Sequence, residues 1–65
     1  MNVTLIITKT DESQSEINGE FEALPRIGDQ IMLNDGISYE VTYVTFLQGD
    51  GNKFHVNINL DQQID

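Results

Sequence analysis

Few side chains in this 65-residue sequence could carry out acid–base or metal chemistry. There is one histidine, His55, and there is no cysteine. No motif pairs His55 with a serine or cysteine nucleophile, and a single imidazole needs carboxylate ligands beside it to make a zinc site. We therefore expect His55 to be an ordinary, outward-facing residue of a strand.

Two groups of oxygen-bearing side chains could bind a divalent cation. Asp50-Gly51-Asn52 is similar to the opening of a calcium loop, but the later ligands and the closing glutamate of an EF-hand are missing, so a hairpin turn is the simpler interpretation. Asp11, Glu12 and Glu16 could hold an ion, or act as acid and base, only if they converged on a cleft. Their polar surroundings indicate a solvated loop. We expect no catalytic, cofactor-binding or metal-binding residue, and so no enzyme.

The charge of the chain is strongly one-sided. Eleven acidic residues face only Lys9, Arg26 and Lys53, which gives a formal charge of −8 at pH 7 and a pI near 4.1. Such a surface repels nucleic-acid phosphates and anionic lipids and attracts basic partners. We expect no direct nucleic-acid binding and no membrane binding. With no secretory signal and no apolar run near the ~20 residues that span a bilayer, a cytoplasmic location is expected.

Apolar and polar side chains alternate along most of the sequence, which is the period of a β-strand. Residues 3–9 are rich in β-branched types and predict a first strand, and residues 53–60 predict a last one. The side chains expected to face the core from these two strands are Val3, Leu5 and Ile7, then Phe54, Val56, Ile58 and Leu60. We expect the tail 61–65 to be frayed.

The position of the second strand is open to two interpretations. Alternation over residues 17–24 predicts a strand there, but Asn18-Gly19 inside it is also the dipeptide that best tolerates a tight hairpin turn. Either a turn at residues 11–14 pairs this strand with the first, or a small hairpin folds at Asn18-Gly19. We favour the turn at 11–14, because residues 15–17 make a poor strand by themselves.

The middle of the chain predicts a sharp turn and then two strands. Pro25 lacks an N–H and cannot lie in a central ladder, so the chain turns over residues 24–29. A short strand containing Ile31 and Leu33 follows, and residues 37–47 form the longest strand. Its apolar alternation shifts phase halfway along, which a β-bulge near Tyr43 would explain.

Five short strands in 65 residues, with no window for a helix longer than about one turn, define the fold class. A chain of this length encloses one core, so we expect a single small β-barrel domain over residues 1–65. An OB barrel usually needs more chain and often a helix. The sequence therefore predicts an all-β, five-stranded, SH3-like, partly open barrel.

One pattern resembles a known group of proteins. The residues are Leu24-Pro25-Arg26-Ile27-Gly28-Asp29-Gln30-Ile31, then Asp35-Gly36, then Tyr39-Glu40-Val41-Thr42-Tyr43-Val44. This run is similar to a loose group of short bacterial and phage proteins, most of them without an assigned activity, and the resemblance implies a small SH3-like barrel. It differs from peptide-binding SH3 domains, because it has no tryptophan and no Ala-Leu-Tyr-Asp-Tyr run. We expect Pro25, Gly28 and Asp29 to shape the turn.

Several residues are candidates for binding a partner protein. Arg26 stands at the sharpest turn and could pair with Asp29 or Glu22, or anchor a partner's carboxylate. Acids that alternate with core residues could form a strip on the outer face, and Tyr43 could stack on a ligand. The candidate partner-binding residues are Glu20, Glu22, Arg26, Glu40 and Tyr43.

Two hypotheses of function follow. The first is a small acidic protein–protein interaction module, which the resemblance suggests is encoded by a phage or mobile element. Its partner would be a basic protein or a second copy of itself, bound through a strand edge or through the acidic face. The alternative is an inhibitor that mimics nucleic acid and occupies the basic channel of a host nucleic-acid-binding protein. The two differ in salt dependence, because a mimic's complex weakens steeply as salt is added.

Overall fold

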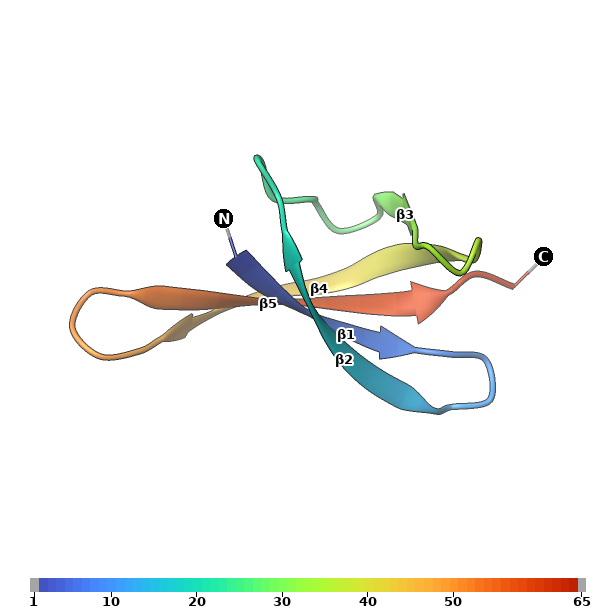
Figure 1. The fold of residues 1–65 in the computed structure, drawn as a ribbon, viewed down its shortest axis with the longest axis horizontal. Helices are drawn as coiled ribbons and strands as arrows, with labels where there is room; N and C mark the ends of the chain where they lie inside the picture. The colour runs from blue at the N-terminus through green and yellow to red at the C-terminus, as the bar shows by residue number, and fades with distance from the viewer. Residues whose placement is uncertain (1, 65) are drawn as a thin grey trace.

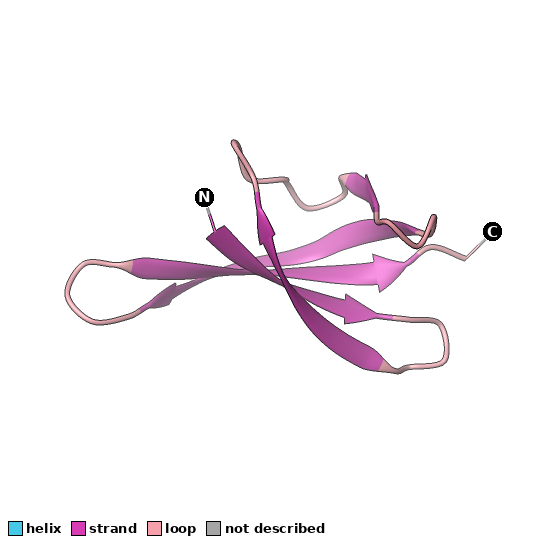
Figure 2. Cartoon of the chain, in the orientation of Figure 1, coloured by secondary structure: helices cyan, strands magenta, loops and turns pink. Residues whose placement is uncertain are grey.

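The computed structural model describes residues 2–64 and contains strands, turns and loops in that range (Figure 2). The five strands are β1 (Asn2–Thr8), β2 (Gln14–Glu20), β3 (Gln30–Met32), β4 (Ser38–Gln48) and β5 (Phe54–Gln62). None of the described residues forms a helix that is long and apolar enough to cross a membrane. The all-β prediction with five strands is confirmed.

The strands form one curled sheet in the order β2-β1-β5-β4-β3 (Figure 1). Neighbouring strands run antiparallel, except that β1 and β5 are parallel. This order is that of a meander rolled toward a ring, in which the last strand, β5, lies beside the first, β1, while β2 and β3 are not paired. The ring is open only where β2 and β3 would meet. The fold is a partly open SH3-like barrel, as the sequence predicts.

The core lies on the concave face of the sheet, which we call the core face. Odd-numbered residues of β1 and even-numbered residues of β5 point into it. The buried side chains are Val3, Leu5, Ile7, Tyr39, Val41, Val56, Ile58 and Leu60. Phe21, Leu24 and Val44 are partly buried and pack against this cluster. The opposite, convex side of the sheet is the outer face.

A β-bulge bends β4, the longest strand. Val41 pairs with Leu60 and Tyr43 with Asn59, so the register shifts between them and Thr42 is the extra residue. The bulge moves the core-facing positions from odd to even numbers, which leaves Val41 in the core and Tyr43 on the outer face. The predicted bulge near Tyr43 is confirmed.

The second strand differs from its predicted bounds of 17–24. It begins earlier, at Gln14, and ends at Glu20, with Asn18-Gly19 inside the ladder rather than in a turn. The predicted turn at 11–14 is confirmed. The Lys9 N–H donates to the Ser13 C=O at 2.9 Å, and this bond closes the loop between β1 and β2. Pairing with β1 outweighs the weak strand propensity of residues 14–16. Residues after Glu20 leave the sheet and cross the core face.

The hairpin of β4 and β5 is longer than the sheet it belongs to. β1 has seven residues and its ladder with β5 begins at the Val3–Val56 pair, so the residues before Val56 project beyond the body (Figure 1). We call residues 46–55 the hairpin arm. Phe54 was predicted to be inward and lies on the core face, but it is 59% exposed because no strand or loop among residues 2–64 covers the arm. That prediction of burial is wrong.

The tail predicted to be frayed is mostly ordered. β5 continues to Gln62, and the Gln63 N–H donates to the Ser38 C=O at 3.0 Å. The end of the predicted tail, Asp65, lies outside the described residues.

Candidate partner-binding surface

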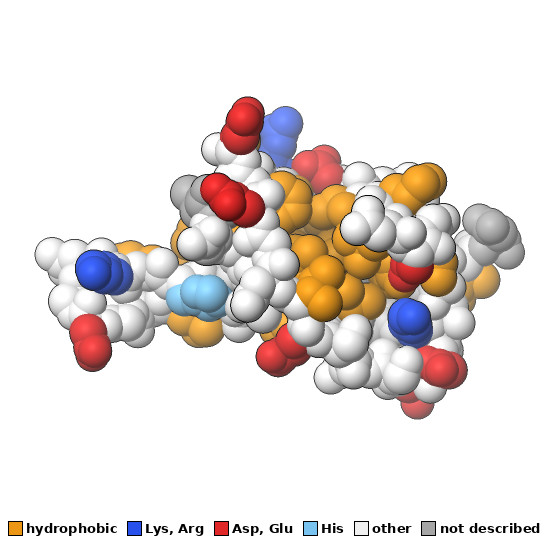
Figure 3. Space-filling view, in the orientation of Figure 1, with side chains coloured by type: hydrophobic (Ala, Val, Ile, Leu, Met, Phe, Trp, Pro, Cys, Tyr) orange, Lys and Arg blue, Asp and Glu red, His pale blue; other side chains and the backbone are white. Residues whose placement is uncertain are grey.

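The open side of the barrel is a cleft between β2 and the β3–β4 turn. Its volume is about 380 Å³, and hydrophobic side chains are visible on this face of the molecule (Figure 3). The lining residues are Ile7, Lys9, Ser15, Ile17, Met32, Leu33, Asn34, Asp35 and Tyr39. We call this cleft the seam. It is apolar in its centre and carries one cation, Lys9, and one carboxylate, Asp35, among its lining side chains.

The edge of the seam formed by β2 has unpaired backbone groups. The bond from the Lys9 N–H to the Ser13 C=O marks a hydrogen-bonded pair, and such pairs alternate with non-bonded ones in an antiparallel ladder. In the unbroken β1–β2 register, Ser15, Ile17 and Gly19 therefore bond to β1. The residues whose N–H and C=O groups point away from β1, toward the open edge, are Gln14, Glu16, Asn18 and Glu20. An edge of this kind is a template for another strand.

The two faces of β2 differ in chemistry. Ile17 pairs with Leu5 and so shares the core face, where it is 45% exposed toward the seam. Glu16 and Glu20 are exposed on the outer face. Residues 10–25 contain five carboxylates and no lysine or arginine. The β2 edge is therefore apolar on the side of the seam and negatively charged on the other side.

The turn at residues 25–29 is built as expected. Gly28 has a φ of 96°, which a residue with a side chain rarely adopts. The carboxylate of Asp29 accepts a hydrogen bond from the Arg26 N–H at 2.8 Å, and the Asp29 N–H donates back to the Arg26 C=O at 3.0 Å. The contact between these two residues is therefore through the backbone of Arg26, and its side chain is exposed.

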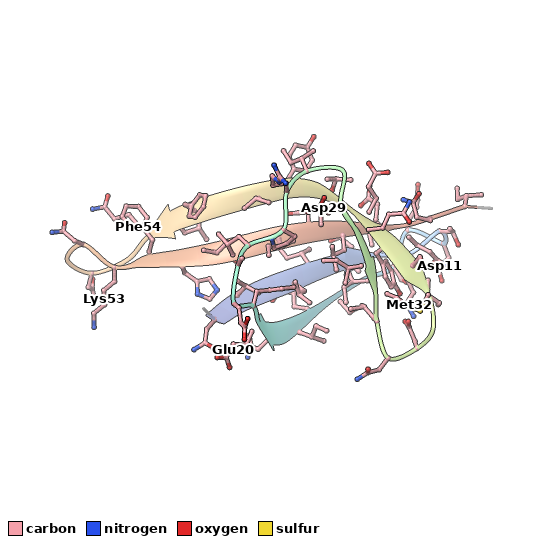
Figure 4. The ribbon with its side chains drawn as sticks, turned by 90° about the horizontal axis from the view of Figure 1, so that it is seen from above. Asp11, Glu20, Asp29, Met32, Lys53 and Phe54 are labelled. Carbon is pink, nitrogen blue, oxygen red and sulfur yellow. The ribbon has the colours of Figure 1, made fainter. Side chains whose placement is uncertain are left out.

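The predicted site residues do not gather in one place. Glu20 pairs with Asn2 at one end of β1, whereas Glu40 pairs with Asp61, beside Thr8 at the other end of β1. Glu20 and Glu40 therefore lie six residues apart along the strand direction, which is about 20 Å. Glu20 also lies apart from Asp11 and from the end of the arm (Figure 4). Glu20 and Glu40 therefore do not belong to one acidic strip.

Tyr43 and the hairpin arm present exposed apolar surface. Tyr43 is 65% exposed on the outer face, as is Leu47, at 44%. Phe46 and Phe54 lie diagonally across the β4–β5 ladder on the core face and are 57% and 59% exposed. Lys53 and Phe54 mark the far end of the molecule from Asp11 and Met32 (Figure 4).

Sequence reasoning missed the arm because it judged each strand alone. The available signal was the difference in length: β4 and β5 have eleven and nine residues, whereas β1, which pairs with β5, has seven, so the β4–β5 hairpin projects at one end. The aromatic residues in the projection then lack a covering layer.

His55 lies on the outer face, where its Nε2 and the Thr4 Oγ1 share a hydrogen bond of 2.7 Å. It borders a shallow hollow of about 610 Å³ beside Val3 and Glu20. Within residues 2–64, no three histidine, aspartate or glutamate side chains gather as they would around a metal ion. The chemistry available to His55 is that of a surface imidazole with one hydroxyl partner.

Three pKa shifts follow from hydrogen bonds and burial. The Ile37 N–H and the Tyr39 hydroxyl both donate to Asp35, at 2.8 and 2.9 Å, and lower the pKa of that carboxyl. Burial, with the Asp35 carboxylate beside it, raises the pKa of Tyr39. The hydroxyl and N–H of Ser13 lower the pKa of Asp11. The bonds to Asp35 tighten the turn between β3 and β4 at the seam, and those to Asp11 tighten the turn between β1 and β2.

No protein-family model matches the chain, and comparison with characterised proteins and with solved structures gives no significant match.

Proposed function

We propose that the protein is an interaction module that accepts an extended segment of a partner protein at the seam, as an added strand beside β2. The observation that carries this proposal is a seven-residue edge strand that borders an apolar cleft. Strand addition obtains affinity from main-chain hydrogen bonds and specificity from alternate side chains. Both elements are present: the outward N–H and C=O groups of β2, and the apolar surface next to Ile17.

The two faces of β2 define the chemistry of the partner segment. Side chains of an added strand that fall on the core face meet Ile17 and the seam, so they should be apolar. Those on the outer face lie beside Glu16 and Glu20, where opposite charges across strands are favourable. The partner segment should therefore alternate lysine or arginine with valine, isoleucine or leucine. The charge of −8 also draws a basic segment toward the protein from a distance.

The experiment is a binding titration with a labelled peptide of about eight residues that alternates lysine and valine. Binding is measured by fluorescence anisotropy. We expect the doubly substituted variant Glu16→Lys with Glu20→Lys to bind about tenfold more weakly, because each cross-strand charge pair becomes repulsive. Asp50→Lys makes the same kind of charge change at the tip of the arm and should have little effect.

A polylysine peptide of equal length separates strand addition from simple charge attraction. If it binds as well as the alternating peptide, the acids act as a diffuse anionic surface, which is what mimicry of nucleic acid would require. Weaker binding of polylysine, together with protection of the β2 edge, supports the proposal. Equal binding contradicts it.

A further inference from the structure

The distal half of β4 is a second open edge, separate from the seam. β3 pairs only with Ser38–Glu40, and the turn before it uses the N–H and C=O of Val41 through Asp29 and Gly28. Beyond Val41 no strand lies on this side of β4 within the described residues. This edge carries Phe46, Leu47 and the neighbouring exposed Tyr43.

The hydrogen-bond pattern of the hairpin shows which groups are available. The Gly49 N–H donates to the Lys53 C=O at 2.8 Å, so this is a hydrogen-bonded pair. Alternation makes Leu47–His55 and Thr45–Asn57 bonded pairs as well. The residues of β4 whose N–H and C=O groups point away from β5 are Val44, Phe46 and Gln48.

We propose that a second copy of this chain pairs with this edge, β4 against β4, about a two-fold axis at Phe46. Antiparallel pairing centred there places Phe46 opposite the Phe46 of the second copy, and Val44 opposite its Gln48. In this register all three outward-pointing residues of each copy are hydrogen-bonded to the other copy. If the pairing shifts by two residues, one of the three in each copy loses its partner. The two exposed phenylalanines then meet on the core face, with Phe54 of each copy diagonally behind.

The distribution of charge favours a second copy here. Between Val41 and Leu60 the chain has one aspartate, Asp50, and one lysine, Lys53, so this stretch is neutral while the rest carries the charge of −8. A second copy brought to β2 would place Glu16 and Glu20 against like charges. At the arm the two bodies stay apart and the joined surface is uncharged, with Phe46 at its centre, so the repulsion between them is weakest.

The inference stands independently of the proposed function, and its test is the mass in solution. The wild-type chain is measured by sedimentation at about 100 µM, where a dimer with a micromolar Kd is nearly fully formed. We expect a dimer, and we expect Phe46→Lys and Phe46→Glu each to be monomeric, because like charges then face each other across the axis. An equimolar mixture of the two variants should recover the dimer.

The control is Ile17→Lys on the β2 edge, which should dissociate the peptide complex but leave the dimer unchanged. Phe46 is exposed, so its replacement should not unfold the chain, and a far-ultraviolet spectrum of each variant verifies this. A monomeric wild type overturns the proposal, as does a dimer that persists in both Phe46 variants. If the mixed variants stay monomeric, or if Ile17→Lys dissociates the dimer, the interface lies elsewhere and the proposal is wrong.

Discussion

At the scale of single residues, the turn at 25–29 depends on backbone conformation more than on charge. Gly28 occupies the left-handed region with φ of 96°, and a Cβ placed there would meet no atom within 4 Å beyond its own chain neighbours. The cost of a substitution is therefore conformational strain alone. Gly49 has no such φ, and its nearest neighbour, the Lys53 carbonyl oxygen at 3.6 Å, is at ordinary contact distance.

These two glycines make a matched pair for a stability measurement. We expect Gly28→Ala to lower the free energy of unfolding by about 1–2 kcal/mol, the usual cost of left-handed backbone for a residue with a Cβ. Gly49→Ala should change it by less than about 0.5 kcal/mol. Urea titrations of both variants and the wild type provide the check, and equal effects would show that the turn does not hold Gly28 in that conformation.

Asp35 gives a second prediction at this scale. The hydrogen bonds from Ile37 and Tyr39 lower the pKa of the Asp35 carboxyl in the folded chain. The stability that these bonds supply is therefore present at pH values above the pKa that Asp35 has in the unfolded chain. This stability is lost as the pH falls through the lower, folded value. We expect the wild type to exceed Asp35→Asn in stability at neutral pH, and the gap to narrow below about pH 4. Unfolding midpoints measured from pH 7 to pH 2 test this, and a gap that widens in acid would contradict it.

At the scale of strands, the alternation of apolar residues predicts which face a residue occupies but not whether anything covers it. Val3, Leu5 and Ile58 have the predicted face and are buried. Phe54 has the predicted face and is exposed, because burial depends on the length of the neighbouring strand. The start of β2 could not be predicted from residues 14–16, since their position in the sheet comes from pairing with β1 rather than from propensity.

The same strand therefore contains an internal comparison. Ile58 is fully buried, and Ile58→Ala should cost about 2–5 kcal/mol in unfolding free energy from lost burial and the cavity it leaves. Phe54→Ala removes a larger side chain from the arm, where we expect a change below about 0.5 kcal/mol in the monomer. Chemical denaturation at low protein concentration measures both. A cost for Phe54→Ala near that of Ile58→Ala would mean that the arm is packed in solution.

At the scale of the whole molecule, charge and edges divide the surface into two regions. The β2 edge is acidic and the arm is neutral, and neither property was visible from the total of −8. The partly open barrel followed from strand number and chain length, but the position of its opening did not. That position depends on β3 having three residues against seven in β2, too few to close the ring.

Salt should affect the two regions in opposite directions. Added salt screens the attraction between Glu16 or Glu20 and a basic segment, so peptide binding should weaken, but less steeply than the complex of a nucleic-acid mimic, because main-chain hydrogen bonds still hold the peptide. The same screening reduces repulsion between two acidic bodies, so self-association at Phe46 should strengthen. Titrations of both equilibria from low to high sodium chloride would reveal this, and parallel changes would show that one surface serves both.

The most direct test of the open seam is hydrogen exchange at the backbone amides of β2. Without a ligand, the outward amides of Glu16, Asn18 and Glu20 should exchange rapidly, while the inward amides of Ile17 and Gly19 are protected by β1. With the alternating lysine–valine peptide bound, these outward amides should become protected as well, because each would donate to the added strand. Outward amides that exchange as rapidly as before, in a protein saturated with peptide, would show that no strand is added at β2 and would contradict the proposed function.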